Sequence, residues 1–325
     1  MFGFLLKRIA LGVVALWAGS FLSFCFFASV FLPLRGRPLL PAYWHWLSGM
    51  PDGRSFSQGL VLGRLWPIVL PALAHTAVLL AYVLVLVAVF AIAVGCFGAL
   101  RRGSPVDALL RSITYGAWAV PPFIVGLVLQ LVFAGELGGR SGLGWFPAAG
   151  WAGQCPGGIG IDLHTFRCPS AGSGVVYVGH VLWFLTLPAV ALAAGFVGLH
   201  ARYLRAALVA QLDAPYIATA RAKGLSERRV VLRHALRNSL AVVVPVVLGD
   251  FGAIFGASLA VDFLFGLNGI GSVFVRVLNW NSNVPVVDTY AAQLLLLIGG
   301  ALVIAVSVLG ELAVGLIDPR VGFER

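Results

Sequence analysis

The sequence predicts an all-α integral membrane protein with about six transmembrane helices. Hydrophobic residues make up 60% of its 325 residues and charged residues only 10%, whereas a soluble domain carries about 25% charged residues. The apolar residues gather in runs of roughly twenty or more, the length that a helix needs to cross a bilayer. Each run is expected to be helical because lipid offers no hydrogen-bond partner to an unpaired backbone group.

The expected spans follow one another along the chain. They cover residues 9–32, 71–100, 113–134, 178–199, 240–265 and 290–317. The first follows Lys7 and Arg8 and exceeds the apolar core of a cleavable signal peptide, so we interpret it as a retained span. On this division, residues 1–70 hold the first span and an outer segment, residues 71–320 form a transmembrane domain of five helices, and residues 321–325 form a tail.

The distribution of basic residues predicts the orientation. If the N-terminus lies inside, the inner segments carry more lysine and arginine than the outer ones, which matches the general bias toward positive cytoplasmic loops. Both termini are therefore expected in the cytoplasm. The same bias accounts for the net charge of +10. Nucleic-acid binding is not expected, because the sequence contains no basic–aromatic motif of that kind.

The first outer segment, residues 34–70, is rich in tryptophan, proline and glycine. Its aromatic residues include Tyr43, Trp44, Trp46 and Trp66. Aromatic side chains gather at the boundary between membrane and water. We therefore expect these four to form an interfacial belt.

Pro121 and Pro122 interrupt the third apolar run. A broken helix at membrane depth is tolerated where it lines a cavity or packs against protein. The prolines are thus candidates for lining a transport pathway, and a simple packing kink is the alternative.

Three acidic residues fall within the last two apolar runs: Asp250, Asp262 and Glu311. Acids inside a membrane are candidates for a proton or cation relay, or they lie near the water boundary or pair with a basic group of a partner. Asp262 and Glu311 stand near the ends of their spans, which favours the second interpretation. Asp250 is central and is a candidate to line the pathway and meet the cargo.

The outer segment between the third and fourth spans contains Cys155 and Cys168, which bracket Asp162 and His164. On an oxidising outer face a disulfide between the two cysteines is the favoured interpretation. Free thiols and a metal site are alternatives, although the spacing matches no common metal site. No metal-binding motif is expected elsewhere in the sequence.

Residues 211–237 form the most charged part of the chain. Asp213 and Glu227 balance only part of its basic charge, which comes from Arg221, Lys223, Arg228, Arg229, Arg233 and Arg237. A single charge at a helix midpoint costs on the order of 3 kcal/mol to insert into a membrane. This stretch is therefore expected to lie outside the bilayer, between the fourth and fifth spans.

The same stretch predicts a helix, a tight turn and a second helix. Asp213 is a good N-cap, and Pro215 fits a first helical turn. Gly224 can adopt the left-handed conformation that ends a helix. Ser226 can cap the second helix, with Glu227 near the positive end of its dipole. Two short helices joined at a glycine and held outside the membrane are typical of a docking element.

These residues resemble a known family. Ala218, Thr219 and Ala220, followed after three residues by Gly224, are similar to the EAA loop of ABC importer permeases. The runs 219–225 and 233–238 resemble the dipeptide, oligopeptide and nickel branch of that family. The resemblance covers most of the chain, includes residues 144–151 and 316–321, and is strongest from residue 202 to 321. The broader family ends this motif with Ile-x-Leu-Pro. Here the corresponding residues are His234, Ala235, Leu236 and Arg237, as in the peptide branch.

The resemblance implies a permease subunit of an ATP-driven importer in the inner membrane of a prokaryote. It implies four partners besides membrane lipid: a second permease subunit, two ATPase subunits and an extracytoplasmic solute-binding protein. In this family the EAA loop enters a groove on the ATPase. The residues that this assigns to coupling are Ala218, Thr219, Ala220, Arg221, Lys223, Gly224, Leu225 and Leu236.

The division of labour follows from a motif that the sequence lacks. No phosphate-binding loop of the form G-x-x-x-x-G-K-[ST] occurs, so ATP and magnesium are expected on partner subunits, and neither a cofactor nor an enzymatic activity is expected on this chain. Peptides are the first expectation for the cargo, and nickel chelates or other small solutes remain open. The competing class is an ion-coupled secondary transporter that uses Asp250 or Glu311 as its relay.

Overall fold

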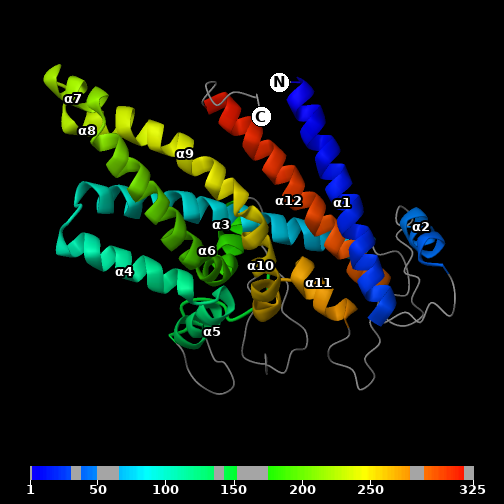
Figure 1. Ribbon diagram of the computed structural model, residues 1–325. Helices are drawn as coiled ribbons and strands as arrows, with labels where there is room; N and C mark the ends of the chain where they lie inside the picture. The colour runs from blue at the N-terminus through cyan, green and yellow to red at the C-terminus, as the bar shows by residue number, and fades with distance from the viewer. Residues whose placement is uncertain are drawn as a thin grey trace.

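The computed structural model describes residues 2–30, 38–49, 66–134, 143–151, 175–278 and 289–317. Helices dominate this part of the chain (Figure 1). In chain order they are α1 (Phe2–Val30), α2 (Leu39–Gly49), α3 (Trp66–Leu100), α4 (Pro105–Ala119), α5 (Pro122–Phe133), α6 (Val175–Leu212), α7 (Pro215–Ala222), α8 (Glu227–Arg229), the π-helix η1 (Val230–Ala235), α9 (Leu236–Gly249), α10 (Phe251–Phe265), α11 (Ile270–Val277) and α12 (Thr289–Ile317). The prediction of an all-α protein is confirmed.

Several helices in the described part are long and apolar enough to cross a membrane. Five qualify singly: Leu6–Ser29, Trp66–Leu100, Val175–Leu212, Glu227–Gly249 and Ala291–Gly310. Two bent pairs, α4 with α5 and α10 with α11, qualify when each pair is taken together, which raises the number to seven. The expected number of about six lies within this range, and the integral membrane class is confirmed.

The third expected span, residues 113–134, is not one helix, as the break predicted at Pro121 and Pro122 implied. The chain forms α4 and α5, which meet at an angle of 101°. Val120, between them, is extended because the ring of Pro121 disfavours a helical conformation in the preceding residue. The helix α4 begins at Pro105, where the Ser104 hydroxyl accepts a hydrogen bond of 3.2 Å from the Asp107 N–H.

The fifth expected span, residues 240–265, is also wrong as a single helix. Its first part belongs to a continuous helical stretch from Glu227 to Gly249. The α-helical pattern is interrupted at Asp250, and α10 runs on in a different direction (Figure 1). Gly249 and Gly252 flank the break, and glycine is the weakest helix former after proline. The break therefore lies where the helix is least stable locally.

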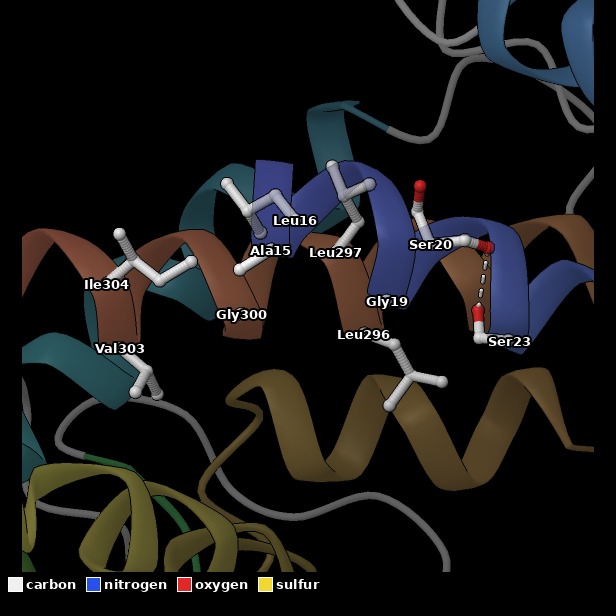
Figure 2. Close-up of a pocket in the computed structure, with 10 residues that line it drawn as sticks. All are labelled: Ala15, Leu16, Gly19, Ser20, Ser23, Leu296, Leu297, Gly300, Val303 and Ile304. Atoms are coloured by element: carbon white, nitrogen blue, oxygen red, sulfur yellow. Dashed lines mark hydrogen bonds between the residues drawn. The ribbon is translucent and has the colours of Figure 1, made fainter. Parts of the chain in front are cut away.

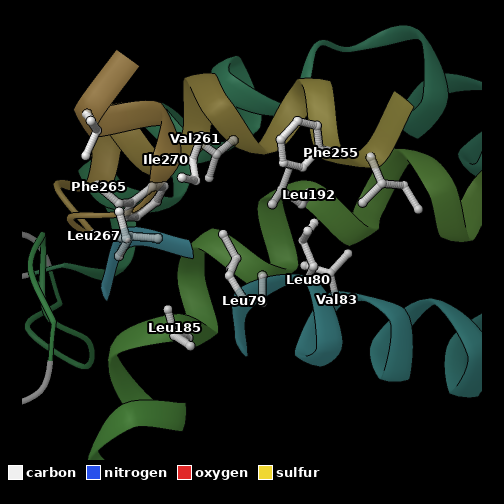
Figure 3. Packing of buried hydrophobic residues seen from close by; sticks show 14 of the residues in the cluster. Leu79, Leu80, Val83, Leu185, Leu192, Phe255, Val261, Phe265, Leu267 and Ile270 are labelled. Atoms are coloured by element: carbon white, nitrogen blue, oxygen red, sulfur yellow. The ribbon is translucent and has the colours of Figure 1, made fainter. Parts of the chain in front are cut away.

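The core forms where α3 and α6 pack together, covered by α10 and α11 (Figure 3). Its side chains include Leu79, Leu80, Val83, Leu185, Leu192, Phe255, Val261, Phe265 and Ile270. Two glycines allow close helix packing. A Cβ at Gly95 of α3 would lie 2.9 Å from the Ala201 carbonyl oxygen of α6, and one at Gly198 of α6 would contact the Thr114 carbonyl oxygen of α4.

Asp262 has a structural role that neither of its sequence interpretations included. It is 2% exposed. Its carboxylate accepts hydrogen bonds from the Gly269 N–H at 3.0 Å, the Ser272 N–H at 2.9 Å and the Ser272 hydroxyl at 3.1 Å. A further hydrogen bond, of 2.9 Å, runs from the Ile270 N–H to the hydroxyl of Thr76. These acceptors satisfy the first N–H groups of α11, which lipid could not.

Residues 143–151, part of the motif noted in the sequence, fold over the same end of the core. The Gly150 N–H donates to the Phe265 carbonyl oxygen at 2.8 Å. The buried Trp151 ring stacks on His75 of α3, with 4.0 Å between ring centroids. This short segment thus connects α3 to the end of α10.

At the edge of the fold, α1 packs against α12, and the unexpected helix α2 packs against α1 (Figure 1). Tyr43 and Trp46 of α2 are buried with Phe24 of α1, so the expected interfacial belt is wrong for these two residues. Trp44 remains exposed. A cavity of about 370 Å³ between α1 and α12 is lined by small and aliphatic side chains (Figure 2).

Candidate functional site

The charged stretch lies at one end of the molecule, as the sequence predicted. At about 1.5 Å per residue, the 38 residues of α6 extend roughly 57 Å, almost twice the thickness of the hydrocarbon core. Part of α6 therefore extends beyond the hydrocarbon, and its C-terminal end carries α7. In Figure 1, α7 and α8 lie at the top of the view, and α5 and α11 lie at the bottom.

One face of α7 is buried. Ile217 is fully buried and Ala220 is 8% exposed. They belong to an apolar cluster that joins α7 to three other elements. Its other buried members are Ala99 of α3, Leu208 of α6, and Val230 and Ala235 of η1. Because the cluster draws on α3, α6 and η1, α7 is fixed to the helices that enter the membrane.

The opposite face of α7 is uncovered within the described part of the chain. Its exposed residues include Tyr216, Ala218, Thr219, Arg221 and Lys223. The coupling residues predicted from the sequence therefore divide into two groups. Ala220 is buried, and Leu225 and Leu236 are half-buried, whereas Ala218, Thr219, Arg221, Lys223 and Gly224 are exposed.

The turn after α7 has the predicted conformation. Gly224 adopts a left-handed φ of +76°, and its N–H donates to the Arg221 carbonyl oxygen at 2.9 Å. The chain then turns Leu225 toward the apolar cluster of α7. A Cβ at Gly224 would meet no atom within 4 Å, so the backbone conformation and not a lack of space favours glycine here.

The predicted N-cap of α7 is wrong. Ala214 occupies that position, and Pro215 is the first helical residue as expected. Asp213 instead accepts a hydrogen bond of 2.6 Å from Arg102 in the turn between α3 and α4. This hydrogen bond lowers the pKa of Asp213. Ser226 does stand at the N-cap of α8, but its hydroxyl makes no capping hydrogen bond to a described residue.

Arg221 and Glu227 form an ion pair across the Gly224 turn that the sequence analysis missed. Arg221 donates to the two carboxylate oxygens of Glu227 at 2.6 and 3.1 Å. Both side chains are about half exposed, and the pairing raises the pKa of Arg221. The signal in the sequence is the presence of opposite charges on either side of a predicted tight turn.

The second helix of the element is longer than expected and contains a π-helix. Instead of a short helix outside the membrane, α8, η1 and α9 run without interruption from Glu227 to Gly249. The Leu236 N–H donates to the Val231 carbonyl oxygen, five residues back. Single turns of π-helix inside α-helices are frequent at functional sites. Here the π-helix connects the exposed element to the membrane span.

Asp250, the central acid, contacts a buried histidine. Asp250 Oδ2 lies 3.0 Å from Nε2 of His200, which belongs to α6. His200 is fully buried and the Asp250 side chain is 33% exposed. The other ring nitrogen of His200, Nδ1, has no hydrogen-bond partner among the described residues. The pair links the break between α9 and α10 to α6.

The remaining predicted site residues are only partly described. Pro121 is exposed and Pro122 half-buried at the bend between α4 and α5, and their lining of a pathway stays a prediction. Cys155 and Cys168 lie outside the described residues, as does the side chain of Glu311. Within the described ranges, no group of three or more histidine, cysteine or acidic residues is arranged to hold a metal ion.

The fold and this site define a class of protein: a multi-pass helical membrane protein with a short helix that is exposed on one face and fixed to the spans on the other. Comparison with known families then assigns the chain. Residues 91–323 match the model of the binding-protein-dependent transport system inner membrane component. Because the match covers most of the sequence, the chain belongs to this family and is a multi-pass permease subunit of a multi-subunit ABC transporter.

Curated relatives are permeases as well. The chain is 28% identical to the di/tripeptide transport system permease protein DppB of Pseudomonas aeruginosa, over 89% of this chain and 82% of the relative. It is 30% identical to the glutathione transport system permease protein GsiC of Escherichia coli, over 74% and 67%. It is 29% identical to the peptidoglycan transport system permease protein YejB of Agrobacterium fabrum, over 75% and 61%.

Proposed function

We propose that the chain is one of two permease subunits of an ATP-driven peptide importer, in which α7 binds an ATPase subunit. The observation that carries the proposal is the division of α7 into two faces. Ile217 and Ala220 are buried against the ends of other helices, while Ala218 and Thr219 are exposed. A helix that is fixed on one face and uncovered on the other is suited to receive force from a partner.

A displacement of α7 has a physical route into the membrane. The apolar cluster joins α7 to η1, and η1 continues into α9. The far end of α9 lies at Asp250, which contacts His200 of α6. Movement of α7 by the ATPase would therefore shift α9 relative to α6 at the break before α10. The permease would alternate between outward-open and inward-open states whose balance depends on ATP.

The complex would contain a second permease subunit, two ATPase subunits that bind ATP and magnesium, and an extracytoplasmic solute-binding protein. The family description, which names binding-protein-dependent transport, supports the last of these. This chain would carry no catalytic site and no cofactor of its own.

We infer that α7 and both termini face the cytoplasm. The first turn of α1 and the last turn of α12 lie at the same end of the molecule as α7 and α8 (Figure 1). That end carries basic residues of the α3–α4 turn and of α7 and α8, including Arg101, Arg102 and Arg221. This arrangement agrees with the bias toward positive cytoplasmic segments.

Peptides are the proposed cargo because relatives are named for di/tripeptides, glutathione and peptidoglycan. Nickel chelates and other small solutes are the alternatives within the same class of importer. Pro121, Pro122 and Asp250 are the candidate pathway residues.

The test is gentle extraction of the complex from its native membrane, followed by identification of the proteins that co-purify. We expect a second permease subunit and ATPase subunits to accompany the wild-type chain. Ala218→Trp places a bulky side chain on the exposed face of α7 and should abolish ATPase recovery. Ser48→Trp, on the exposed face of α2, is the matched control and should not. Retention of the ATPase by the α7 variant would contradict the proposal.

The competing class, an ion-coupled transporter, would have to rest on the His200–Asp250 pair, against the family match. A buried imidazole that contacts a carboxylate at membrane depth is also an arrangement that a proton relay uses. If the protein were an ion-coupled transporter, uptake would stop when the proton gradient is collapsed while ATP is maintained. The proposed importer would continue, so this one measurement separates the two functions.

A further inference from the structure

A small groove between α4 and α6 is lined by three arginines. Arg111 comes from α4, and Arg202 and Arg205 come from α6. Thr114, Ala201 and Gly98 form part of its floor and walls. Neither the coupling element nor the candidate pathway residues include any of these side chains.

One carboxylate faces these three arginines. Asp107 is fully buried and accepts two hydrogen bonds of 2.6 Å from Arg205. Arg111 Nε lies 3.9 Å from the same carboxylate, beyond hydrogen-bond distance, and its side chain is 49% exposed. Because Arg205 already neutralises Asp107, the groove holds an excess of two positive charges on Arg111 and Arg202.

Arg202 is held in a fixed orientation. Its Nε donates to the Gly198 carbonyl oxygen at 3.2 Å. Its guanidinium carbon lies 4.1 Å from the centroid of the Tyr115 ring and 5.7 Å from that of Trp118. Within the described part of the chain, the terminal nitrogens of Arg202 have no acceptor. A guanidinium fixed on aromatic rings with its donors available is suited to an anionic oxygen ligand.

The position of the groove along α6 puts it near the expected depth of lipid headgroups. Arg202 follows the fourth apolar run, residues 178–199, by three positions, so at about 1.5 Å per residue it lies within roughly 5 Å of the expected edge of the hydrocarbon. Arg111 lines the same groove from α4. Ile113 and Trp118 are 56% and 55% exposed on the hydrocarbon side of Arg111.

We propose that Arg111 and Arg202, at the surface beside this groove, bind the phosphate of an anionic phospholipid in the leaflet nearer to α7. Arg111 and Arg202 contact the phosphate oxygens, and the exposed side chains of Ile113 and Trp118 pack against an acyl chain. A soluble anion would contact the same guanidinium groups, but only a lipid would also contact the exposed apolar surface beside them. The inference depends on the charges and the depth of the groove, and it stands whether or not α7 binds an ATPase.

The test compares lipid retention by the full-length chain, with the subunits that co-purify, in nanodiscs of phosphatidylcholine with and without phosphatidylglycerol. After detergent exchange, native mass spectrometry counts the phosphatidylglycerol that remains bound. Arg111→Gln/Arg202→Gln should weaken its binding roughly thirtyfold, the change expected when two basic groups no longer contact an anionic headgroup. Arg228→Gln/Arg229→Gln removes the same charge outside the groove and should retain it.

Folding is controlled by the single variant Arg111→Gln, which alters a half-exposed side chain and should give an intermediate occupancy. Thermal unfolding provides a second measurement, since phosphatidylglycerol should raise the midpoint of the wild type and of the control but not of the double variant. Equal lipid retention by the double variant and the control would overturn the proposal. So would an equal rise in midpoint produced by inorganic phosphate alone, because the ligand would then be a soluble anion.

Discussion

The helix that runs from α8 through η1 to α9 has an acidic residue at each end, and the two ends differ in how they hold it. At the α7 end, Glu227 pairs with Arg221, and both side chains are about half exposed. At the other end, Asp250 contacts His200, which is fully buried. Exposed ion pairs contribute little to stability, whereas a buried polar group that loses its partner is costly. The coupling end can therefore exchange its contacts for those of a partner, while the membrane end is constrained by its own chain.

The largest expected effect comes from Asp262, whose buried carboxylate accepts hydrogen bonds from Gly269 and Ser272 at the start of α11. Asp262→Ala leaves the first N–H groups of α11 without their acceptors and should lower stability by about 2–5 kcal/mol. Asp262→Asn keeps a side-chain oxygen and should lower it less. Thermal unfolding of the detergent-solubilised protein measures both variants, and an alanine variant as stable as the wild type would show that the buried acids do not fix the membrane end.

Asp250→Ala should have the next largest effect. It leaves His200 Nε2 unpaired in a buried position and should cost about 1–3 kcal/mol. A double-mutant cycle with His200→Ala isolates the contribution of the pair itself. If the two substitutions are additive in thermal unfolding, the 3.0 Å contact contributes nothing, and the contrast between the two ends of the helix disappears.

Gly224→Val tests the coupling end. A β-branched residue in the left-handed conformation costs about 1–2 kcal/mol, and the strain should displace α7 and uncouple ATP hydrolysis from uptake. Gly103→Val is the matched control, because Gly103 also has a positive φ, of +78°, and open space around its Cα. The control should lose similar stability but keep coupled transport. Normal coupling in the Gly224 variant would remove the turn from the mechanism.

The smallest effect is expected at the pair between Arg102 and Asp213. The lowered pKa of Asp213 means that its stabilising contribution is present above the unfolded pKa of about 3.9 and is lost as the pH falls through the lower folded pKa. Both side chains are more than half exposed, so this contribution is small, and Asp213→Asn should unfold at nearly the wild-type temperature at neutral pH. A large loss of stability in that variant at neutral pH would show that the exposed end is not loosely held.

Local chemistry in the sequence predicted the start of α7 and the turn that follows it. Pro215 begins α7 and Gly224 ends its turn in a left-handed conformation, because both effects depend on the residue's own backbone preferences. The all-α membrane class followed from composition and run length. The bend at Pro121 was expected in position, but its angle depends on how α4 and α5 pack against α6.

Contacts between distant parts of the chain could not be predicted in the same way. Asp213 is a residue type that favours an N-cap, yet its carboxylate accepts a hydrogen bond from Arg102, more than a hundred positions away. The sequence predicts Asp250 only as an acid inside an apolar run. Its contact with His200, fifty positions away, depends on the fold. The roles of Asp262 and of η1 likewise depend on elements that the sequence does not place relative to one another.

The central claim is that the exposed face of α7 binds an ATPase subunit. The most direct measurement places a photo-activated cross-linking amino acid at Ala218 in the native membrane and identifies the product by mass spectrometry, with the same substitution at Ser48 of α2 as the control. Position 218 should form a cross-link to an ATP-hydrolysing protein, and position 48 should not. Cross-links from position 218 to lipid alone, or the same partner at both positions, would contradict it.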